Sequence, residues 1–290
     1  MRESKEERGT LETTGNTVLL TLGRGKFNIP TEPVSEFPDC PLIPEQNFVT
    51  VSGGLVKMAI RRTSFATDVG DKRYALQGVL FRFANQKLKV AATDSRRLSI
   101  MAGVYQAGSD PSWMASSIVP VKTLTLIDRS MPDGESPIEI GCTPNLLVCK
   151  SDRVEITSKL ISGSFPHFEE IVPRSHNVSL DLMVSDLLSV LRQAALFTDE
   201  ETRGVDFFFN EGTLKLSSEA ATAGTSELEL PISYDGEGIL IRLDPRFFID
   251  FLKTLSPNAA INLKIVDDEV PIVLSTEDGS TYLIVPMTRD

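Results

Sequence analysis

Residues 78–92 read Gly-Val-Leu-Phe-Arg-Phe-Ala-Asn-Gln-Lys-Leu-Lys-Val-Ala-Ala, and the pattern of this stretch returns later in the chain. A period of this length is typical of a tandem of whole domains, because the repeats of solenoid proteins are only ~20 to 50 residues long. The sequence therefore predicts that one folding unit occurs twice. The matched residues lie 126 positions apart: Gly78, Phe81, Phe83, Leu88 and Val90 correspond to Gly204, Phe207, Phe209, Leu214 and Leu216.

The same stretch predicts a β-hairpin. Val79, Phe81 and Phe83 alternate with Leu80 and Arg82, and a second alternating run begins at Leu88. The polar residues 84–87 between the two runs are typical of a tight turn.

A third, partial copy precedes the two complete ones. Residues 16–38, which end in Phe37-Pro38, resemble residues 145–166, which end in Phe165-Pro166, 128 positions further on. We therefore expect three parts: a remnant at 1–46, a middle domain at 47–172 and a C-terminal domain at 173–290.

Each complete repeat is expected to open with a helix and to follow the order helix, strands, helix, strands. Helical spacing of apolar residues begins near Leu55 and, after Ser185 as the expected N-cap, near Leu187. Second helices are predicted around 122–129 and from Asp244-Pro245, an N-cap followed by proline at the first helical position. The fold class is therefore α+β, with two helices packed on antiparallel sheets in a repeat of about 125 residues.

Composition narrows the class of protein. The 290-residue chain is 41% hydrophobic, and no apolar run approaches the ~18 residues that a membrane helix needs. The first eight residues are charged and lack the apolar core of a signal peptide. Three cysteines, Cys40, Cys142 and Cys149, form no CxxC pair, so we expect neither a disulfide framework nor a metal site, and a cytoplasmic location.

An enzyme is the competing class. His167 and His176 are the only histidines, and the Gly-rich segments lack the context of nucleotide-binding loops. Asp267-Asp268-Glu269 is the candidate carboxylate cluster for metal-dependent chemistry. The alternative is an acidic turn that is simply solvated, which is the usual case. No coherent catalytic constellation is found, and no cofactor is expected.

The net charge of −11 argues against general coating of DNA phosphates, which Lys and Arg drive. A local basic surface remains possible if the predicted helices share one face. The alternative is that these cations only solvate helix surfaces. The cations on the predicted helices are Lys57, Arg61, Arg62, Lys122, Arg129, Arg192, Arg246 and Lys253.

Several separate blocks resemble one known family. Residues 71–81 (DKRYALQGVLF), 92–98 (ATDSRRL), 159–166 (KLISGSFP) and 282–287 (YLIVPM) look like the bacterial DNA sliding clamp, the beta subunit of the replicative DNA polymerase III holoenzyme. The resemblance covers nearly the whole chain from about Asn16. It implies a homodimeric ring of clamp domains, closed head to tail around duplex DNA, with helices lining the hole. It also implies no catalysis: such a clamp is a processivity factor in DNA replication.

The resemblance assigns candidate residues to three surfaces. Tyr74, Lys57, Arg61, Lys122, Arg192 and Arg246 would face DNA. Phe27 and Ile29 would pack against Leu196 and Phe197 of a second copy, although ordinary strand alternation explains Phe27 and Ile29 equally well. A hydrophobic cleft would capture short linear motifs of the replicative polymerase, the clamp loader and repair polymerases. Its residues would be Arg73, Leu76, Thr93, Ser95, Arg96, Arg97, Leu98, Pro166, Ile171, Asp244, Phe247, Leu283, Val285, Pro286 and Met287.

The chain also departs from the family pattern. About 80 residues of a first domain are absent before the first complete repeat, which puts ring closure in question and leaves a second reading, a clamp remnant that only binds peptides. In the cleft, Ser95 and Arg96 stand where glycine and often histidine are common. Asp244 and Phe247 stand where asparagine and tyrosine are usual, so peptide preference is expected to differ.

Overall fold

The computed structural model describes residues 8–37, 48–70, 73–105, 116–199, 203–221 and 223–288. Cys40 lies outside these ranges, and so do residues 71 and 72, the first two of the block 71–81. The chain divides into two compact units, Met1–Leu42 and Ile43–Asp290. The larger unit contains both complete repeats.

The first unit is a three-stranded antiparallel sheet, β1 (Gly9–Thr14), β2 (Thr17–Leu22) and β3 (Gly25–Pro30), followed by a short 3₁₀ turn at Val34–Glu36. Leu11, Leu20 and Phe27 lie opposite one another across the strands, so they share one face, and Val18 pairs with Ile29 on it. Among the described residues of this unit only Leu20 is a buried hydrophobic residue. The sheet therefore has an apolar face but no core of its own.

The described residues of the middle repeat form two α-helices, two short 3₁₀ helices and eight strands. Its helices are α1 (Gly53–Thr63) and α2 (Val121–Ser130). Short 3₁₀ helices occur at Ser64–Ala66 (η3) and Tyr74–Gln77 (η4). The strands are β4 (Phe48–Ser52), β5 (Gly78–Ala84), β6 (Lys87–Thr93), β7 (Arg97–Val104), β8 (Ser117–Pro120), β9 (Pro137–Cys142), β10 (Leu146–Lys150) and β11 (Glu155–Lys159).

The C-terminal repeat follows the same order. Its helices are α3 (Val184–Ala194), extended by a 3₁₀ turn at Ala195–Phe197 (η6), and α4 (Pro245–Leu252). The strands are β12 (Val178–Met183), β13 (Val205–Asn210), β14 (Thr213–Ala220), β15 (Gly224–Pro231), β16 (Ile239–Leu243), β17 (Ala260–Ile265), β18 (Ile272–Ser275) and β19 (Ser280–Ile284). In both repeats a strand precedes the first helix, which the sequence pattern did not predict.

Local chemistry explains where several elements begin and turn. Asn85 and Gln86 adopt positive φ values of 51° and 60° in the hairpin between β5 and β6. This is the two-residue turn that suits twisted strands. Asp244 caps α4 by accepting a hydrogen bond from the Arg246 amide, as predicted. The expectation for Ser185 was wrong: α3 already begins at Val184, and the Ser185 hydroxyl donates to Asp186 instead.

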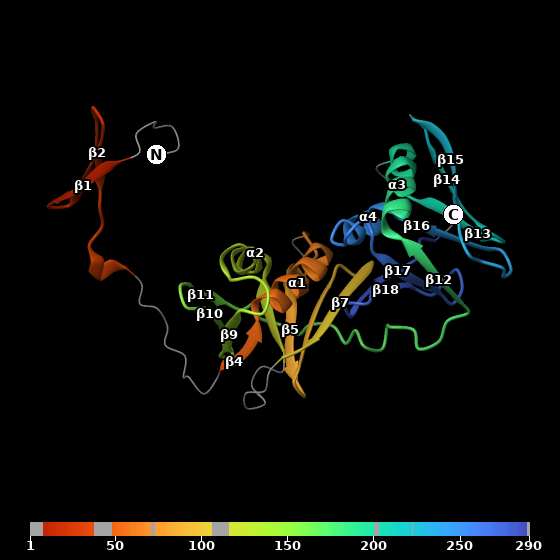
Figure 1. Ribbon diagram of the computed structural model, residues 1–290, viewed down its shortest axis with the longest axis horizontal. Coiled ribbons are helices and arrows are strands. Elements are labelled where there is room, and N and C mark those ends of the chain that lie inside the picture. The colour runs from red at the N-terminus through yellow and green to blue at the C-terminus, as the bar shows by residue number, and fades with distance from the viewer. Residues whose placement is uncertain are drawn as a thin grey trace. The chain divides into compact units, whose positions relative to one another are not determined.

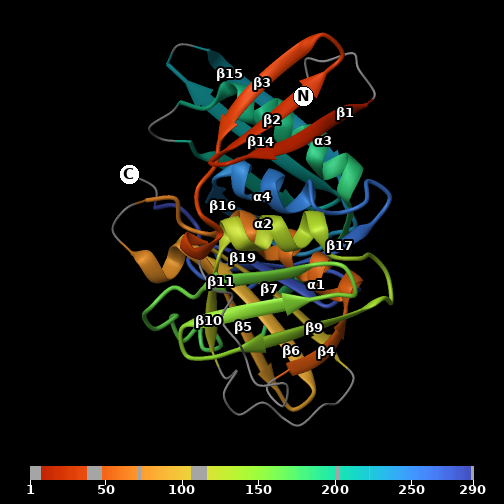
Figure 2. The same cartoon turned by 90° about the vertical axis from the view of Figure 1, so that its left-hand side faces the viewer.

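Three antiparallel sheets build the larger unit. A four-stranded sheet, β11-β10-β9-β4, belongs to the middle repeat and appears in this order in Figure 2. Its counterpart in the C-terminal repeat is β15-β14-β13-β16. The third sheet has eight strands, β12-β17-β18-β19-β7-β6-β5-β8, and it crosses from one repeat to the other where β19 pairs with β7. Figure 1 shows the four helices along one side of this unit, with β5, β7, β17 and β18 below them.

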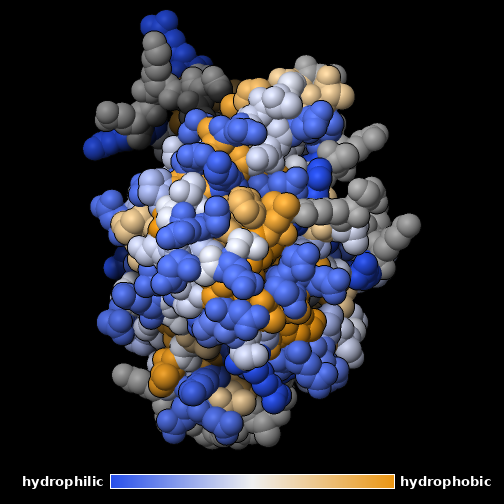
Figure 3. Space-filling model, turned by 90° about the vertical axis from the view of Figure 1, so that its right-hand side faces the viewer, coloured by the Kyte–Doolittle hydropathy of each residue, from blue (hydrophilic) through white to orange (hydrophobic). Residues whose placement is uncertain are grey.

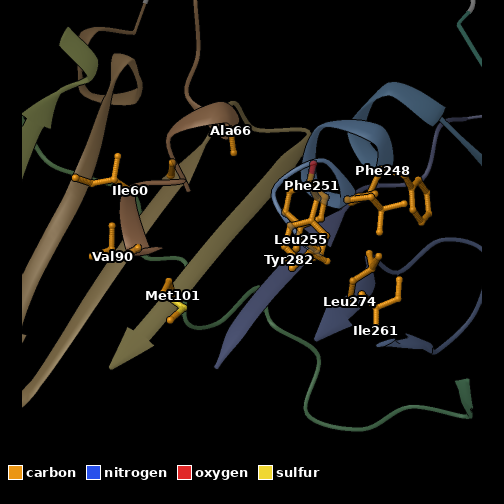
Figure 4. Packing of buried hydrophobic residues seen from close by; sticks show 14 of the residues in the cluster. Ile60, Ala66, Val90, Met101, Phe248, Phe251, Leu255, Ile261, Leu274 and Tyr282 are labelled. Carbon is orange, nitrogen blue, oxygen red and sulfur yellow. The ribbon is translucent and has the colours of Figure 1, made fainter. Parts of the chain in front are cut away.

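The core is also continuous between the repeats. Residues of both, including Ile60, Val90, Phe248 and Leu274, belong to one buried cluster (Figure 4). At the crossing point Tyr282 stacks on Phe251 with ring centroids 4.7 Å apart, and Phe65 of the middle repeat lies 5.5 Å from Tyr282. Two repeats thus share one sheet and one core. In the parts of the chain that the structure describes, no helix has the length and apolarity to cross a membrane.

Candidate functional site

The helices expose cations that have no carboxylate partner. Lys122 and Arg129 lie on the exposed side of α2, Arg192 on α3, and Lys253 directly follows α4. None of these four forms an ion pair or a side-chain hydrogen bond within the described residues. Because the helices lie on one side of the larger unit, four uncompensated positive charges lie on that side.

Lys57 does not belong to this exposed set, which corrects the sequence-based assignment. Its side chain is only 5% exposed, its Nζ donates to the Met131 carbonyl at 2.9 Å, and it pairs with Asp133 at 2.8 Å. The hydrogen bond from Lys57 to Asp133 holds the pKa of the Asp133 carboxyl below its usual range. Lys57 therefore ties α1 to the end of α2.

Two other predicted DNA-facing arginines are already paired. Arg61 donates to Asp128 at 2.8 Å on the exposed surface. Arg246 donates from Nε and Nη2 to the two carboxylate oxygens of Asp244, the N-cap of its own helix. Their charge is therefore partly compensated. Tyr74, in contrast, is largely exposed in η4 and makes no side-chain hydrogen bond within the described chain.

Two arginines of the middle repeat hold the C-terminal repeat. Arg62 on α1 donates to Asp278 at 2.7 Å and to the carbonyl and hydroxyl of Thr254. Burial alone would raise the pKa of Asp278, but hydrogen bonds from Thr276, Ser280 and Arg62 lower it to about 2. The carboxylate therefore stays charged and bound to Arg62 at neutral pH.

Arg97 is the second of these arginines, and its guanidinium is held by partners from both repeats. Its Nε donates to Asp94 at 2.9 Å, its Nη1 to Asp250 at 2.7 Å, and its Nη2 to the Phe65 carbonyl at 2.9 Å. Its guanidinium also lies 4.7 Å from the centroid of the Phe247 ring. Arg97 pairs with Ile284 and Leu98 with Leu283, so the two neighbours point to opposite faces of the sheet.

A buried apolar cluster occupies the sheet face opposite the helices. We call it the junction cluster. It joins strands of both repeats to the segment that links them. Its residues are Leu80, Ala91, Leu98, Ile118, Phe165, Phe168, Val273 and Leu283.

The linking segment is fixed to this cluster by Phe168. Its ring packs edge-on against Phe165, with centroids 5.9 Å apart, and lies under Arg82 and Lys89 at 5.7 and 5.8 Å. Arg82 also pairs with Glu169. Phe168 was missed by sequence reasoning, because only its position after Phe165-Pro166 marks it.

The predicted cleft residues divide by exposure. Leu76, Thr93, Leu98 and Leu283 are buried, whereas Ile171 and Val285 are 49% and 39% exposed and Pro166 and Arg96 are exposed. The structure brings Leu98 and Leu283 together directly. Buried apolar side chains flanked by exposed ones form a floor on which an apolar ligand can bind.

The remaining predicted cleft residues lie at the beginning of α4 and at the tail. Asp244 is 5% exposed, and Phe247 is half-buried beside Arg97. Pro286 and Met287 line a hollow of about 400 Å³ together with Leu240 and Arg242. Figure 3 shows the side of the molecule that lies to the right in Figure 1, where hydrophobic residues form separate patches among hydrophilic ones.

One departure from the family pattern, Ser95 in place of the common glycine, lies in the turn between β6 and β7. Ser95 has a φ of 79°, in the left-handed region that favours glycine. Its backbone amide donates to Thr93, and its hydroxyl accepts a hydrogen bond from Arg73 at 2.5 Å. The side chains of Ser95 and Arg73 thus form a polar pair at the turn that precedes β7.

The predicted contact residues for a second copy are largely exposed. Phe27 and Ile29 lie on the apolar face of the first unit, and Leu196 is 72% exposed at the end of α3. Phe197 is half-buried. Within the described residues, Leu196 belongs to neither buried hydrophobic cluster.

The acidic turn that was the basis of the enzyme alternative has a structural role. Asp267 Oδ1 accepts hydrogen bonds from the amides of Glu269 and Val270 at 3.0 and 2.8 Å. Within the described ranges no group of three or more His, Cys, Asp or Glu side chains is arranged to hold a metal ion.

Comparison with known proteins assigns the two repeats separately. Residues 50–167 match the family profile "DNA polymerase III beta subunit, central domain", and residues 169–288 match "DNA polymerase III beta subunit, C-terminal domain". The Beta sliding clamp of Chlamydia trachomatis is 32% identical over 274 residues, which cover 94% of this chain and 65% of that protein. The Beta sliding clamp of Escherichia coli K12 is 27% identical over 94% of this chain and 74% of its own.

Solved structures share the fold. The sliding clamp of Bacillus subtilis superposes with a TM-score of 0.89 at 23% identity, over 97% of this chain and 75% of that one. A Pseudomonas aeruginosa sliding clamp with a bound ligand gives 0.88 at 23% identity, over 97% and 76%. Two profile matches that together cover most of the chain, and this common fold, lead to one conclusion: the chain belongs to the family of the DNA polymerase III beta subunit, the bacterial sliding clamps.

Proposed function

We propose that this chain is a non-catalytic processivity factor in DNA replication, which holds duplex DNA beside its helices and tethers a DNA polymerase to it. The observation that carries the proposal is that a basic surface and an apolar cluster lie on opposite sides of the larger unit. Lys122, Arg129, Arg192 and Lys253 lie unpaired on the helix side, and the junction cluster lies on the other face of the eight-stranded sheet.

The helix-side cations suit phosphate contacts without base readout. Contacts to the DNA backbone carry no sequence information, and salt weakens them. A few long, flexible cations on an otherwise acidic protein of net charge −11 would hold DNA loosely. Loose binding permits sliding, so enclosure would supply the retention that affinity does not.

Enclosure requires a closed assembly, and we propose that a second copy supplies it. Phe27 and Ile29 on the apolar face of the first unit would pack against Leu196 and Phe197 of the second copy. Exposed apolar side chains at both positions support this pairing. The chain spans 65% of the length of its Chlamydia trachomatis relative and 74% of that of the Escherichia coli protein, and ring closure is a proposal for the assembly as a whole.

The junction cluster is the proposed docking site for short motifs of the replicative polymerase, the clamp loader and repair polymerases. Peptide recognition of this type depends on a few apolar anchors in a groove with a polar rim. Leu76, Leu98 and Leu283 would form the floor, and Ile171 and Val285 would flank the bound side chain. Ser95 and Arg96 would belong to the rim.

The experiment that tests this function is retention on DNA of defined topology. The chain is loaded by its clamp loader onto a nicked circular plasmid, and bound protein is measured by gel filtration before and after a restriction enzyme linearises the plasmid. Retention on the circle with loss after cutting is expected. Loss from both forms, with a polymerase peptide still bound, would support the narrower role of a peptide-binding module.

A further inference from the structure

A second hollow lies beside the junction cluster, on the same face of the sheet. It measures about 230 Å³ and lies between the linking segment at 172–176 and the strands β17, β18 and β19. Val172 and Val273 line this hollow, and both also pack in the junction cluster. The hollow therefore adjoins the proposed peptide site.

The charge of this hollow is one-sided. Arg174, His176 and Lys264 line it, and none of the lining residues is acidic. These three side chains form no ion pair or hydrogen bond within the described chain. Arg62 and Arg97, by contrast, are held by carboxylates, so Arg174 and Lys264 bring two uncompensated cations to one hollow of this acidic protein.

Hydroxyl groups add polar atoms to the same hollow. Ser275 on β18 and Thr281 on β19 are Cα partners in the strand ladder and both line it. The Ser275 hydroxyl donates to the Asn262 carbonyl at 3.5 Å, which leaves the Thr281 hydroxyl as the donor. On the same face of the sheet, the carboxylate of Asp181 accepts a hydrogen bond from Asn262 at 2.8 Å. A ligand with two acceptor oxygens and a negative charge matches these donors.

The spacing relates the hollow to the apolar floor. Thr281 and Leu283 lie two residues apart on β19 and therefore face the same way. Two residues of a strand span roughly 7 Å. A peptide whose apolar anchor lies on Leu283 would thus reach the hollow with a residue two or three positions away in its own sequence.

We propose that this hollow binds the carboxylate of an aspartate or glutamate that flanks the apolar motif of a partner peptide. The proposal rests on the proposed function of the junction cluster. A DNA phosphate is the less fitting occupant, because the free cations assigned to DNA lie on the helix side and the hollow lies on the other face of the sheet. Charge at a rim of this kind selects between partners more than it adds affinity.

The test compares two fluorescein-labelled peptides that carry the same polymerase clamp-binding motif. One has Asp and Glu on both flanks, and the other has Asn and Gln at the same positions. Anisotropy titrations of the full chain are expected to give about fivefold tighter binding of the acidic peptide, the size of effect expected from one or two exposed ion pairs. The preference is expected to shrink at about 0.5 M NaCl, because exposed charges are screened.

The deciding variant is Arg174→Gln with Lys264→Gln. It should bind both peptides with the affinity that wild type shows for the neutral one, whereas the charge-matched control Lys87→Gln with Arg153→Gln should keep the preference. Both control residues are exposed and unpaired on the middle repeat. Equal binding of both peptides by wild type, or a preference that survives in the deciding variant, would overturn the proposal. Failure of wild type to bind either peptide would instead refute the proposed function of the junction cluster.

Discussion

Leu98 on β7 and Leu283 on β19 lie directly opposite each other across an antiparallel pair, although 185 residues separate them in the sequence. Both are buried in the junction cluster. The pair joins the two repeats into one sheet, and the same pair forms the floor of the proposed peptide site. Substitutions at these positions are therefore expected to lower the free energy of unfolding, whatever their effect on peptide binding.

The first prediction concerns this pair. Leu98→Ala should lower the free energy of unfolding by about 2 to 4 kcal/mol, because it removes buried methyl groups and leaves a cavity. Urea denaturation followed by circular dichroism measures the loss. Leu126→Ala, on the exposed side of α2, is the matched control and should change stability by less than about 0.5 kcal/mol. A wild-type midpoint for Leu98→Ala would show that the β7–β19 junction is loosely packed.

Much of the fold was predictable because its signals are local. The alternation around Phe81 and Phe83 predicted the hairpin, and Asp244-Pro245 predicted the beginning of α4. The repeat period predicted two copies of one unit. The continuous eight-stranded sheet was not predictable in this way, because β7 and β19 pair through backbone groups far apart in the sequence.

The candidate site was less predictable, since helical spacing shows which side a residue occupies but not what lies there. Lys57 is on the polar side of the α1 pattern, yet its side chain is buried and donates to the Met131 carbonyl at the end of α2. Arg97 follows a strand pattern, but its partner Asp250 comes from the other repeat. Long-range partners of this kind leave no mark in local periodicity.

The second prediction separates peptide binding from stability. Ile171→Asp and Val285→Asp alter exposed side chains beside the apolar floor, so each should weaken binding of a polymerase motif peptide at least about tenfold, as expected for loss of an apolar contact next to a buried anchor. Both variants should unfold at the wild-type urea concentration. Val69→Asp, at a fully exposed site, controls for the added charge. Undiminished peptide binding by both variants would move the docking site away from the junction cluster.

The third prediction contrasts two lysines that were both assigned to DNA. Lys57→Ala should cost about 1 to 3 kcal/mol of stability, because the Met131 carbonyl loses its buried donor. Lys122→Ala should leave stability unchanged and reduce the slope of log affinity for DNA against log salt by about one. Unfolding curves and filter-binding titrations measure the two effects. A smaller salt slope for Lys57→Ala with unchanged stability would contradict this prediction and place Lys57 at the DNA surface.

The fourth prediction concerns the buried thiols. Burial raises the pKa of Cys142 to about 11 and that of Cys149 to about 12, so almost no thiolate exists at pH 8. Iodoacetamide should leave both residues unmodified in the folded protein and alkylate both in urea. Peptide mapping by mass spectrometry reads each position separately. Rapid labelling of Cys149 without denaturant would mean that β10 opens readily.

The fifth prediction follows from the pair formed by Arg62 and Asp278. Folding lowers the pKa of Asp278 from 3.8 to about 2, so its contribution to stability is fully present above pH 4 and is lost as pH falls toward 2. Asp278→Asn should therefore cost about 1 to 2 kcal/mol at pH 7, after allowance for partial exposure, and progressively less between pH 4 and pH 2. Thermal unfolding of both proteins across this range measures the difference. Asp152→Asn, in the exposed turn between β10 and β11, should show no such convergence. A difference from wild type that stays constant from pH 7 to pH 2 would mean that the Asp278 carboxylate does not stabilise the junction through its charge.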